Sequence, residues 1–469
     1  MMPNKKYLIT PLLAALVLAG CANVPVSEPH ALPATPAAFK NLPRTAEAAA
    51  PAAAPATQGQ WWQIFADSRL DELMDRAMAH NTTVQAVAAR LAQARAITRQ
   101  TGSVRAPQVS IDASSGRQGG EYYKSIGQAG TLHQLRLDAS YEVDLIGRLS
   151  KRTQAARLDE QAAQSLLANA RLLVQADVAQ TYFAIRAVDA ERALMRETLA
   201  AYRDSLGLTE RRYAAGDVAE LDVARARTEV AANESLALAL DRRRQELDTA
   251  LAVLVGEVPS VMSLAEGSWS DSLPAVPAGL PSAILTRRPD IAAAQASYEA
   301  AQKRVDVAKT AWFPSLTLTA AAGGASSELS ELLKSSASLW GLNALLSLPL
   351  LDGGRREAGI QSAAAQQDEA AAYYREQVLQ AFKDVEDQLA GLTLLEAQQK
   401  AQAEAVNASE RAMVLSDSRY RNGMVSQLEL LDSRRTMLAN RRQALQVKAA
   451  QFQATVALVK ALGGGWSSS

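Results

Sequence analysis

The fold is decided by two matching stretches, residues 212–221 (RYAAGDVAEL) and residues 419–428 (RYRNGMVSQL). Arg, Tyr, Gly, Val and Leu coincide in them at a constant offset of 419 − 212 = 207 residues. The same offset relates four further pairs: Pro107 and Pro314, Gly147 and Gly354, Asp177 and Asp384, and Asn233 and Asn440. A register kept without insertion or loss over this span indicates an internal duplication with tightly constrained element lengths.

Both halves of the duplication contain the same series of elements. The predicted domains are a first repeat at residues 61–272, a Pro-rich linker at 273–281, and a second repeat with the C-terminal tail at 282–469. Each repeat opens with a predicted helix, at residues 70–104 and 283–311. Two predicted strands follow in each, at residues 109–116 and 132–144, then at 315–323 and 339–351. The Gly- and Ser-rich connectors are predicted surface loops, at residues 116–130 and 323–338.

The segment 132–144 alternates between apolar and polar residues. Its apolar positions are Leu135, Leu137, Ala139, Tyr141 and Val143, and its polar positions are Arg136, Asp138, Ser140, Glu142 and Asp144. Successive side chains of a strand point to opposite faces, so a period of two predicts one apolar face and one polar face.

Long helical hairpins are predicted after the strands. Residues 151–213 contain no Pro and only one Gly, and their apolar residues recur at spacings of three and four. At 1.5 Å per residue such a helix is roughly 90 Å long. It returns after Gly216 through a second helix at residues 217–255, and the second repeat has the same hairpin at residues 355–420 and 426–462 around Gly423. The predicted fold class is therefore mainly α, with four strands in each chain.

The composition excludes several classes of function. The chain of 469 residues has 49 Lys and Arg against 49 Asp and Glu, so it lacks the cationic excess that nucleic-acid binding requires. A single Cys rules out a disulfide framework, and His30, His80 and His133 are too scattered to suggest a metal cluster. No set of residues has the pattern of a catalytic triad or a phosphate loop, so we expect neither an enzyme nor a bound cofactor.

The N-terminus indicates a secreted protein. Residues 1–20 have a cationic start and an apolar run too short to stay as a spanning helix, which is the pattern of a signal peptide. The motif LAGC at residues 18–21 resembles the lipobox of bacterial lipoproteins, in which the Cys, here Cys21, is the lipidated first residue. With Ala22 next, this resemblance implies sorting to the outer membrane. An ordinary signal peptide with an incidental Cys is the alternative.

The stretch that follows is predicted to be a tether. Residues 21–60 are rich in Ala and Pro, which favours an extended segment over a packed domain. Ordered structure is therefore expected to begin near Trp61.

Four strands in one chain cannot form a closed sheet. An open sheet in lipid would leave backbone N–H and C=O groups without partners at its edges. Three copies of the chain supply 3 × 4 = 12 strands, which lies within the range of outer-membrane barrels. We therefore predict a homotrimer with a 12-stranded barrel in outer membrane lipid, continuous with a long α-helical barrel in the periplasm.

The order of elements and four motifs together resemble the TolC family of outer membrane factors. The motifs are WWQIFAD at residues 61–67, RRPDI at 287–291, LDGGR at 351–355 and YRNG at 420–423. The lipobox makes the chain most similar to the lipoprotein branch typified by OprM and NodT. The resemblance covers the whole mature chain. It implies an exit duct for drugs or other small molecules that docks on a periplasmic adaptor and an inner-membrane pump of the resistance-nodulation-division class.

The resemblance also implies a gate at the tip of the second hairpin. Leu428 and Asp432 are four residues apart and share one helical face, and they match the Leu and Asp that form successive constrictions in the OprM-like branch. Glu429 matches a further acidic ring position of the family. The alternative is that Leu428 is ordinary coiled-coil core and that both acids lie on a solvated helix face.

A latch between neighbouring hairpins is implied by the same resemblance. Asp222 and Tyr420 match the acceptor and the donor of the family's latch. Val425 stands where the family has Arg, so the sequence departs from the family's latch at this position. Three nearby cations are the candidates to replace the missing one: Arg421, Arg434 and Arg435. The alternative for Tyr420 is an aromatic ring packed beside a turn.

The main alternative function is a lipid-anchored periplasmic coiled-coil scaffold or adaptor without a pore. Such a protein would share the lipobox and the long hairpins. It would not need two alternating strand pairs, nor their duplication at a constant offset.

Overall fold

The computed structural model describes residues 33–41, 60–127, 129–268, 273–274, 276 and 281–465. The chain divides into two compact units. We call the first the strand unit; it contains Val109–Lys151 and Ala301–Ala372. We call the second the helical unit; it contains Pro33–Gln108, Arg152–Ala300 and Tyr373–Ser469. Cys21, the predicted lipidation site, lies outside the described residues.

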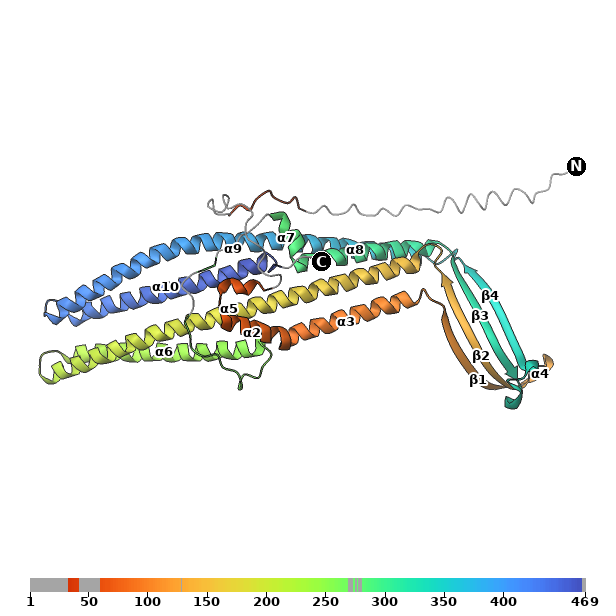
Figure 1. Ribbon diagram of the computed structural model, residues 1–469, viewed down its shortest axis with the longest axis horizontal. Coiled ribbons are helices and arrows are strands. Elements are labelled where there is room, and N and C mark those ends of the chain that lie inside the picture. Colours follow the sequence, from red (N-terminus) through yellow and green to blue (C-terminus); the bar gives the residue numbers. More distant parts are fainter. Residues whose placement is uncertain are drawn as a thin grey trace. The chain divides into compact units, whose positions relative to one another are not determined.

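The strand unit is built on a four-stranded sheet with the order β1-β2-β3-β4 (Figure 1). The strands are β1 (Gln108–Gln118), β2 (Gly130–Val143), β3 (Ser315–Ser326) and β4 (Ser338–Ser347), with the short helix α4 (Glu121–Ser125) between β1 and β2. Strand β3 pairs with both β2 and β4 in antiparallel fashion. The predicted end of the fourth strand at residue 351 is wrong, because β4 stops at Ser347, two residues before Pro349. Pro has no N–H to donate to a sheet.

Two of the predicted loops are shorter than expected. Strand β1 continues to Gln118 and β3 continues to Ser326, so both strands extend into the Gly- and Ser-rich connectors. Gly tolerates extended backbone as readily as turns, and its presence alone does not end a strand.

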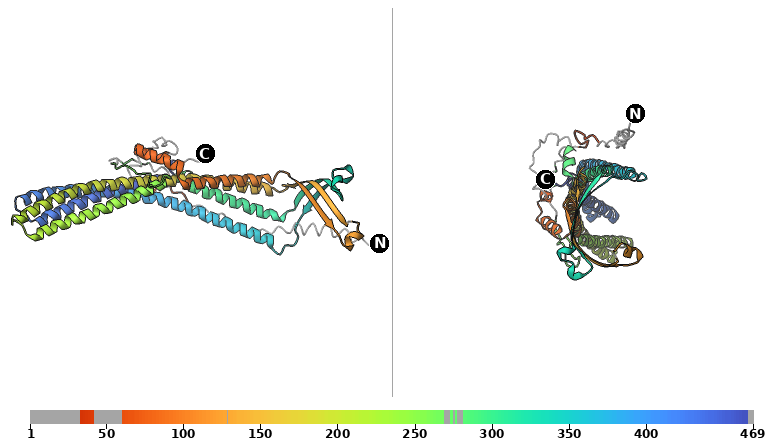
Figure 2. Two further views of the ribbon diagram at one scale, coloured as in Figure 1. Left: turned by 90° about the horizontal axis from the view of Figure 1, so that it is seen from below. Right: turned by 90° about the vertical axis from the view of Figure 1, so that its right-hand side faces the viewer.

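The helical hairpins are confirmed (Figure 2), and the bounds of their helices give the same lengths in the two repeats. Helices α5 (Arg148–Ala214) and α9 (Arg355–Arg421) each have 67 residues. The return helices α6 (Glu220–Leu254) and α10 (Gln427–Ala461) each have 35 residues. All four boundaries keep the offset, since 355 − 148 = 427 − 220 = 207. The turns use Gly216 and Gly423 at φ of 80° and 70°, where a residue with a Cβ would be strained.

The predicted single helix at the start of each repeat is wrong in both. The first is divided into α2 (Ser68–His80) and α3 (Thr82–Ser103), and the second into α7 (Pro281–Arg287) and α8 (Pro289–Lys309). Asn81 breaks the first with extended backbone, and its side chain caps α3 by accepting from the Val84 N–H. Arg288 breaks the second because it precedes Pro289, whose ring disfavours helical backbone in the preceding residue. The two breaks are again 288 − 81 = 207 residues apart.

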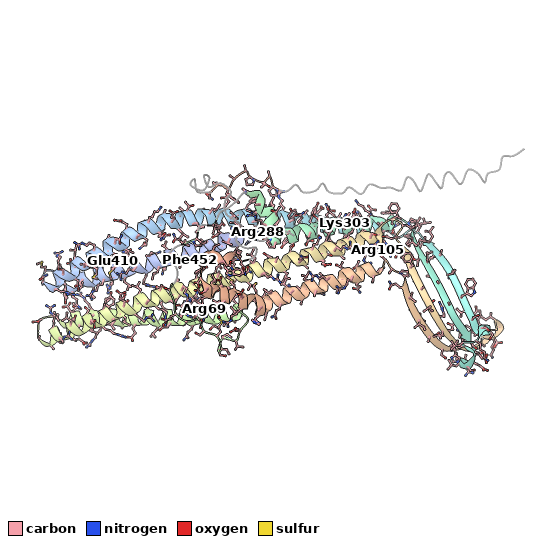
Figure 3. The ribbon with its side chains drawn as sticks, viewed as in Figure 1. Arg69, Arg105, Arg288, Lys303, Glu410 and Phe452 are labelled. Carbon is pink, nitrogen blue, oxygen red and sulfur yellow. The ribbon has the colours of Figure 1, made fainter. Side chains whose placement is uncertain are left out.

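The core of the helical unit consists of separate clusters of buried side chains. In the largest, Phe183 contacts the rings of Phe65 and Phe452, each with ring centroids 4.7 Å apart. Figure 3 labels Phe452 on α10. Trp61 and Trp62 belong to the same cluster. A second cluster lies around Val385 of α9 and includes Phe39. Packed structure therefore begins before Trp61, within the predicted tether.

Candidate functional site

The sheet of the strand unit has one continuous apolar face. In β2, β3 and β4, residues that pair directly across the sheet have side chains on the same face. Following the register from Leu137 therefore collects one set of side chains from the three strands, and all are apolar: Leu137, Ala139, Tyr141 and Val143; Ala322, Ala320, Leu318 and Leu316; Trp340, Leu342, Ala344 and Leu346. The face predicted from β2 alone is thus confirmed and extends over three strands.

The opposite face of these strands is mainly polar. It carries Arg136, Asp138, Ser140 and Glu142 from β2, Thr317 and Thr319 from β3, and Asn343 from β4, and its apolar members at β4 are Leu339 and Leu345. Its charged side chains form two ion pairs: Arg136 with Asp138 at 2.5 Å, and Glu142 with Arg148 at 2.5 Å. A sheet with one dry face and one wet face is typical of a wall between lipid and water.

The apolar face is uncovered in the single chain. Trp340 is 79% exposed and Leu342 is 74% exposed. A patch of this kind marks a surface that contacts a membrane or another protein. Trp312 stacks beneath the guanidinium of Arg356, whose Cζ lies 4.1 Å from the ring centroid.

Two further features, a helix that could cross a membrane and a metal site, are absent from the described residues. No helix in this part of the chain combines the length and the hydropathy that a membrane crossing needs. No group of three or more His, Cys, Asp or Glu side chains in the same part is arranged to hold a metal ion.

The three predicted gate residues lie together on the exposed side of α10. Leu428 is 48% exposed, and Glu429 and Asp432 are also exposed. The Ser426 hydroxyl caps the helix by accepting from the Glu429 N–H at 3.3 Å. The intervening Leu430 and Leu431 are buried and hold α10 in place. The first turn of α10 therefore presents one Leu and two acids, which one chain alone leaves uncovered.

The three predicted latch residues have other partners within the single chain. Arg435 donates from Nε to the buried Glu229 of α6 at 3.0 Å, and this carboxylate raises the pKa of Arg435. The Tyr420 hydroxyl accepts from Arg212 of α5 at 3.4 Å. Asp222 lies 3.8 Å from Arg225 on its own helix. These contacts do not bring the three residues into one cluster, so a latch between chains stays a prediction.

Several residues that join the two hairpins were missed by the sequence analysis. Gln427 donates to Thr209 at 3.1 Å, and both side chains are buried. Glu229 faces Arg435 and also the buried Tyr202, and burial together with this carboxylate raises the pKa of Tyr202 to about 12. Glu229 and its partner are 206 residues apart, so no local motif could have indicated the contact.

The amino-acid sequence matches a known family model twice. The model is described as "Outer membrane efflux protein" and matches residues 73–257 and 280–464. The two matches are themselves offset by 280 − 73 = 207 residues. Among curated proteins, the chain is 33% identical to the pyoverdine export outer membrane protein OpmQ of Pseudomonas aeruginosa, over 97% of this chain and 96% of that protein. It is 30% identical to the cation efflux system protein CusC of Escherichia coli, over 98% of both chains.

Solved structures agree with these matches. The outer membrane protein VceC of Vibrio cholerae superposes with a TM-score of 0.81 at 28% identity, covering 86% of this chain and 98% of that one. The open state of the MtrE outer membrane channel of Neisseria gonorrhoeae gives a TM-score of 0.80 at 27% identity, covering 95% and 98%. The two-faced sheet, the duplicated hairpins and the doubled family match lead to one conclusion: the chain belongs to the outer membrane efflux protein family and functions as an outer membrane efflux channel.

Proposed function

We propose that three copies of this chain form the exit duct of a tripartite efflux system, which passes small molecules from an inner-membrane pump to the exterior. The observation that carries the proposal is the continuous apolar face across β2, β3 and β4, backed by a polar face. Such a sheet separates lipid from water only when it is closed, because open edges in lipid leave backbone groups without partners. Three copies close it with 3 × 4 = 12 strands.

The helical unit supports the same assembly. Helices α5 and α10 are joined within the chain, where Arg442 pairs with Glu191 at 2.6 Å and Gln453 donates to the Gln180 carbonyl at 2.7 Å. Helices α6 and α9 each carry exposed apolar side chains, such as Leu238 at 64% and Leu394 at 70%. In the proposed ring, α9 of one copy packs against α6 of the next, which buries these side chains. The interface is head-to-tail and closes by rotation.

The partners of the duct are a periplasmic adaptor and a pump of the resistance-nodulation-division class. The helical unit lies in the periplasm, and acyl chains on Cys21 add an anchor in the outer membrane. The relatives' names include pyoverdine export, cation efflux and toluene efflux. These names refer to very different substrates although the relatives share one fold, so the pump mainly selects the substrate. The duct itself has no catalytic step. Labelling with palmitate in cells tests the anchor: the wild type takes up label and Cys21→Ser does not.

The decisive experiment is conductance in planar bilayers, with two neighbouring residues of β3 as a matched pair. Ala320 lies on the apolar face and Ala321 on the polar face. An Arg on the lipid face near the middle of a membrane costs about 2 to 4 kcal/mol per chain. We expect Ala320→Arg to abolish channels and detergent-resistant trimers, whereas Ala321→Arg keeps both and changes ion selectivity. No conductance from the wild type would favour the scaffold instead, and equal effects of both variants would reject the assigned faces.

The gate is tested by comparing the same position in the two repeats. Leu428 and Leu221 are equivalent, since 428 − 207 = 221, and both are exposed. We propose that Leu428, Glu429 and Asp432 repeat around the lumen and narrow it, and that Tyr420, Asp222 and Arg435 latch the closed state. Leu428→Ala, or Asp432→Ala with Tyr420→Phe, is expected to increase conductance and antibiotic leakage into cells. Leu221→Ala is expected to change neither, and an equal response would reject the gate.

A further inference from the structure

A short N-terminal stretch of the helical unit, Pro33–Asn41, contacts the second repeat. Its Phe39 is only 4% exposed. The ring lies in a cluster formed by α7, α8, α9 and α10, whose buried members are Ile284, Ile291, Val378, Ala381, Val385, Leu389, Leu458 and Ala461. An aromatic side chain buried to this extent contributes more than an incidental contact of a tether would.

A carboxylate on α9 holds the backbone beside this ring. The N–H of Lys40 donates to Oε1 of Glu386 at 2.7 Å, and the N–H of Asn41 donates to Oε2 at 3.1 Å. Hydrogen bonds to an ionised acceptor are stronger than neutral ones. Glu386 is next to Val385 of the cluster, so one turn of α9 provides both an apolar contact for Phe39 and an anionic contact for the following backbone.

In the first repeat, different residues cover the equivalent part of the core. The residue equivalent to Glu386 is Ala179, since 386 − 207 = 179, and it is fully buried. It lies in the cluster that contains Trp61, Trp62 and Phe65, from the 3-10 helix η2 (Trp61–Phe65) that directly precedes α2. In the first repeat, therefore, the covering aromatic residues are local. In the second, Phe39 comes from the start of the chain.

We propose that Phe39 and Glu386 form a docking site through which the N-terminal segment completes the core of the second repeat. The segment that precedes the first repeat in sequence thus belongs to the second in structure. One consequence rests on the proposed lipid anchor. Phe39 follows Cys21 by 39 − 21 = 18 residues, so a force transmitted along the chain from the anchor acts on the contact between Phe39 and α9 before it acts on Trp61. The docking itself does not depend on the lipid.

Trypsin tests the docking directly, because the bond after Lys40 includes the N–H that Asn41 donates to Glu386. Cleavage requires this stretch to leave α9, so its initial rate reports the population of the undocked state. In the purified full-length protein, we expect Phe39→Ala and Glu386→Ala each to increase the rate of cleavage after Lys40 at least about tenfold. The product is identified by intact mass.

Two variants keep this test discriminating. Asp387→Ala removes the neighbouring acid of α9, which is exposed and pairs with Lys383, and should leave the rate unchanged. Glu386→Gln keeps the shape and one acceptor and should give an intermediate rate. An unchanged rate in Phe39→Ala and Glu386→Ala, or an equal increase in Asp387→Ala, would overturn the proposal. Neither outcome depends on conductance, so the docking and the proposed duct are tested separately.

Discussion

The two repeats share one backbone but differ in the chemistry that holds it. The breaks at Asn81 and Arg288 occupy equivalent positions, and both side chains donate to the end of the return helix. Asn81 donates to the Leu254 carbonyl at 2.8 Å, and Arg288, labelled in Figure 3, donates to the Ala461 carbonyl at 3.2 Å. The acceptors are equivalent too, since 461 − 254 = 207. The duplication has kept the geometry of this contact while exchanging a neutral donor for a charged one.

The interiors of the two hairpins differ further. In the first repeat, Asp189 is 4% exposed at its side chain and pairs with Arg244 at 2.8 Å and Arg186 at 3.3 Å. The positions equivalent to the two cations are Gln451 and Thr393 in the second repeat. Gln451 donates there to Gln399 at 3.0 Å without any charge. The two repeats therefore share their element lengths and backbone contacts, whereas their buried polar side chains differ.

The largest loss of stability is expected from replacing a Gly that occupies the equivalent position in both repeats. Gly256 and Gly463 have φ of 78° and 89°, and a Cβ would lie 2.3 Å from the His80 carbonyl oxygen and 2.6 Å from that of Arg287. Gly256→Ala and Gly463→Ala should each cost about 3 to 5 kcal/mol through backbone strain and overpacking. Thermal unfolding followed by far-UV circular dichroism measures the loss.

The turn glycines are the matched controls for this prediction. Gly216 and Gly423 also have positive φ, but a Cβ at either would meet no atom within 4 Å. Ala at these positions should cost only about 1 kcal/mol, the backbone strain alone. If only one of Gly256 and Gly463 proves sensitive, the two repeats do not depend on the same contact.

The second largest loss of stability should distinguish the interior of the first hairpin from that of the second. Asp189→Asn leaves Arg186 and Arg244 buried beside a neutral side chain, which should cost about 3 kcal/mol. The equivalent residue is Glu396, which is 64% exposed at its side chain and pairs with Lys400. Glu396→Gln should lower the melting temperature little, because exposed ion pairs contribute at most about 1 kcal/mol. Similar losses in the two variants would contradict a first repeat that depends on buried charge.

A smaller difference is expected at the two breaks. Arg288→Asn places the first repeat's residue in the second and removes ion pairs to Asp290 at 2.6 Å and Asp384 at 3.1 Å. Because both acids keep some contact with water, we expect a loss of about 2 kcal/mol. Asn81→Ala removes a helix cap and a buried donor and should cost about 1 to 2 kcal/mol. A larger loss for Asn81→Ala, measured as a shift in denaturant midpoint, would mean that the added charges contribute nothing.

The sequence predicts the long helices and the duplication well because their signals are local. Residues 151–213 lack Pro and have an uninterrupted helical period, so no distant contact is needed to form α5. The break at Asn81 could not be predicted in the same way. Its amide donates to Leu254, which is 173 residues away, and the local pattern of residues 70–104 is helical throughout. Tertiary contact decides the backbone there.

The candidate site shows the same division. The apolar face of β2 is readable from strict alternation, whereas β4 contains the adjacent Leu345 and Leu346, whose faces become clear only from pairing with Thr317 and Leu316. The gate residues follow from a resemblance together with their spacing. Glu229 was missed because a buried carboxylate carries no sequence signal until its distant partner is known.

The smallest predicted effect has opposite signs in the two repeats. Asp177 and Asp384 are equivalent, since 384 − 177 = 207. Burial raises the pKa of Asp177 above its usual value of 3.8, and the charge of Lys460 only partly opposes this. A raised pKa means that folding favours the protonated form, so this contribution to stability is complete below pH 3.8 and is lost as the pH rises through the folded-state pKa. At neutral pH the charge on Asp177 is therefore unfavourable to the fold.

Asp177→Asn should raise the melting temperature slightly at neutral pH and leave it unchanged below pH 3.8. Asp384→Asn should lower it at neutral pH, because Arg288 loses a partner. Melting curves across this pH range compare the two directly, and a decrease for Asp177→Asn would mean that Lys460 pairs with Asp177 as Arg288 does with Asp384.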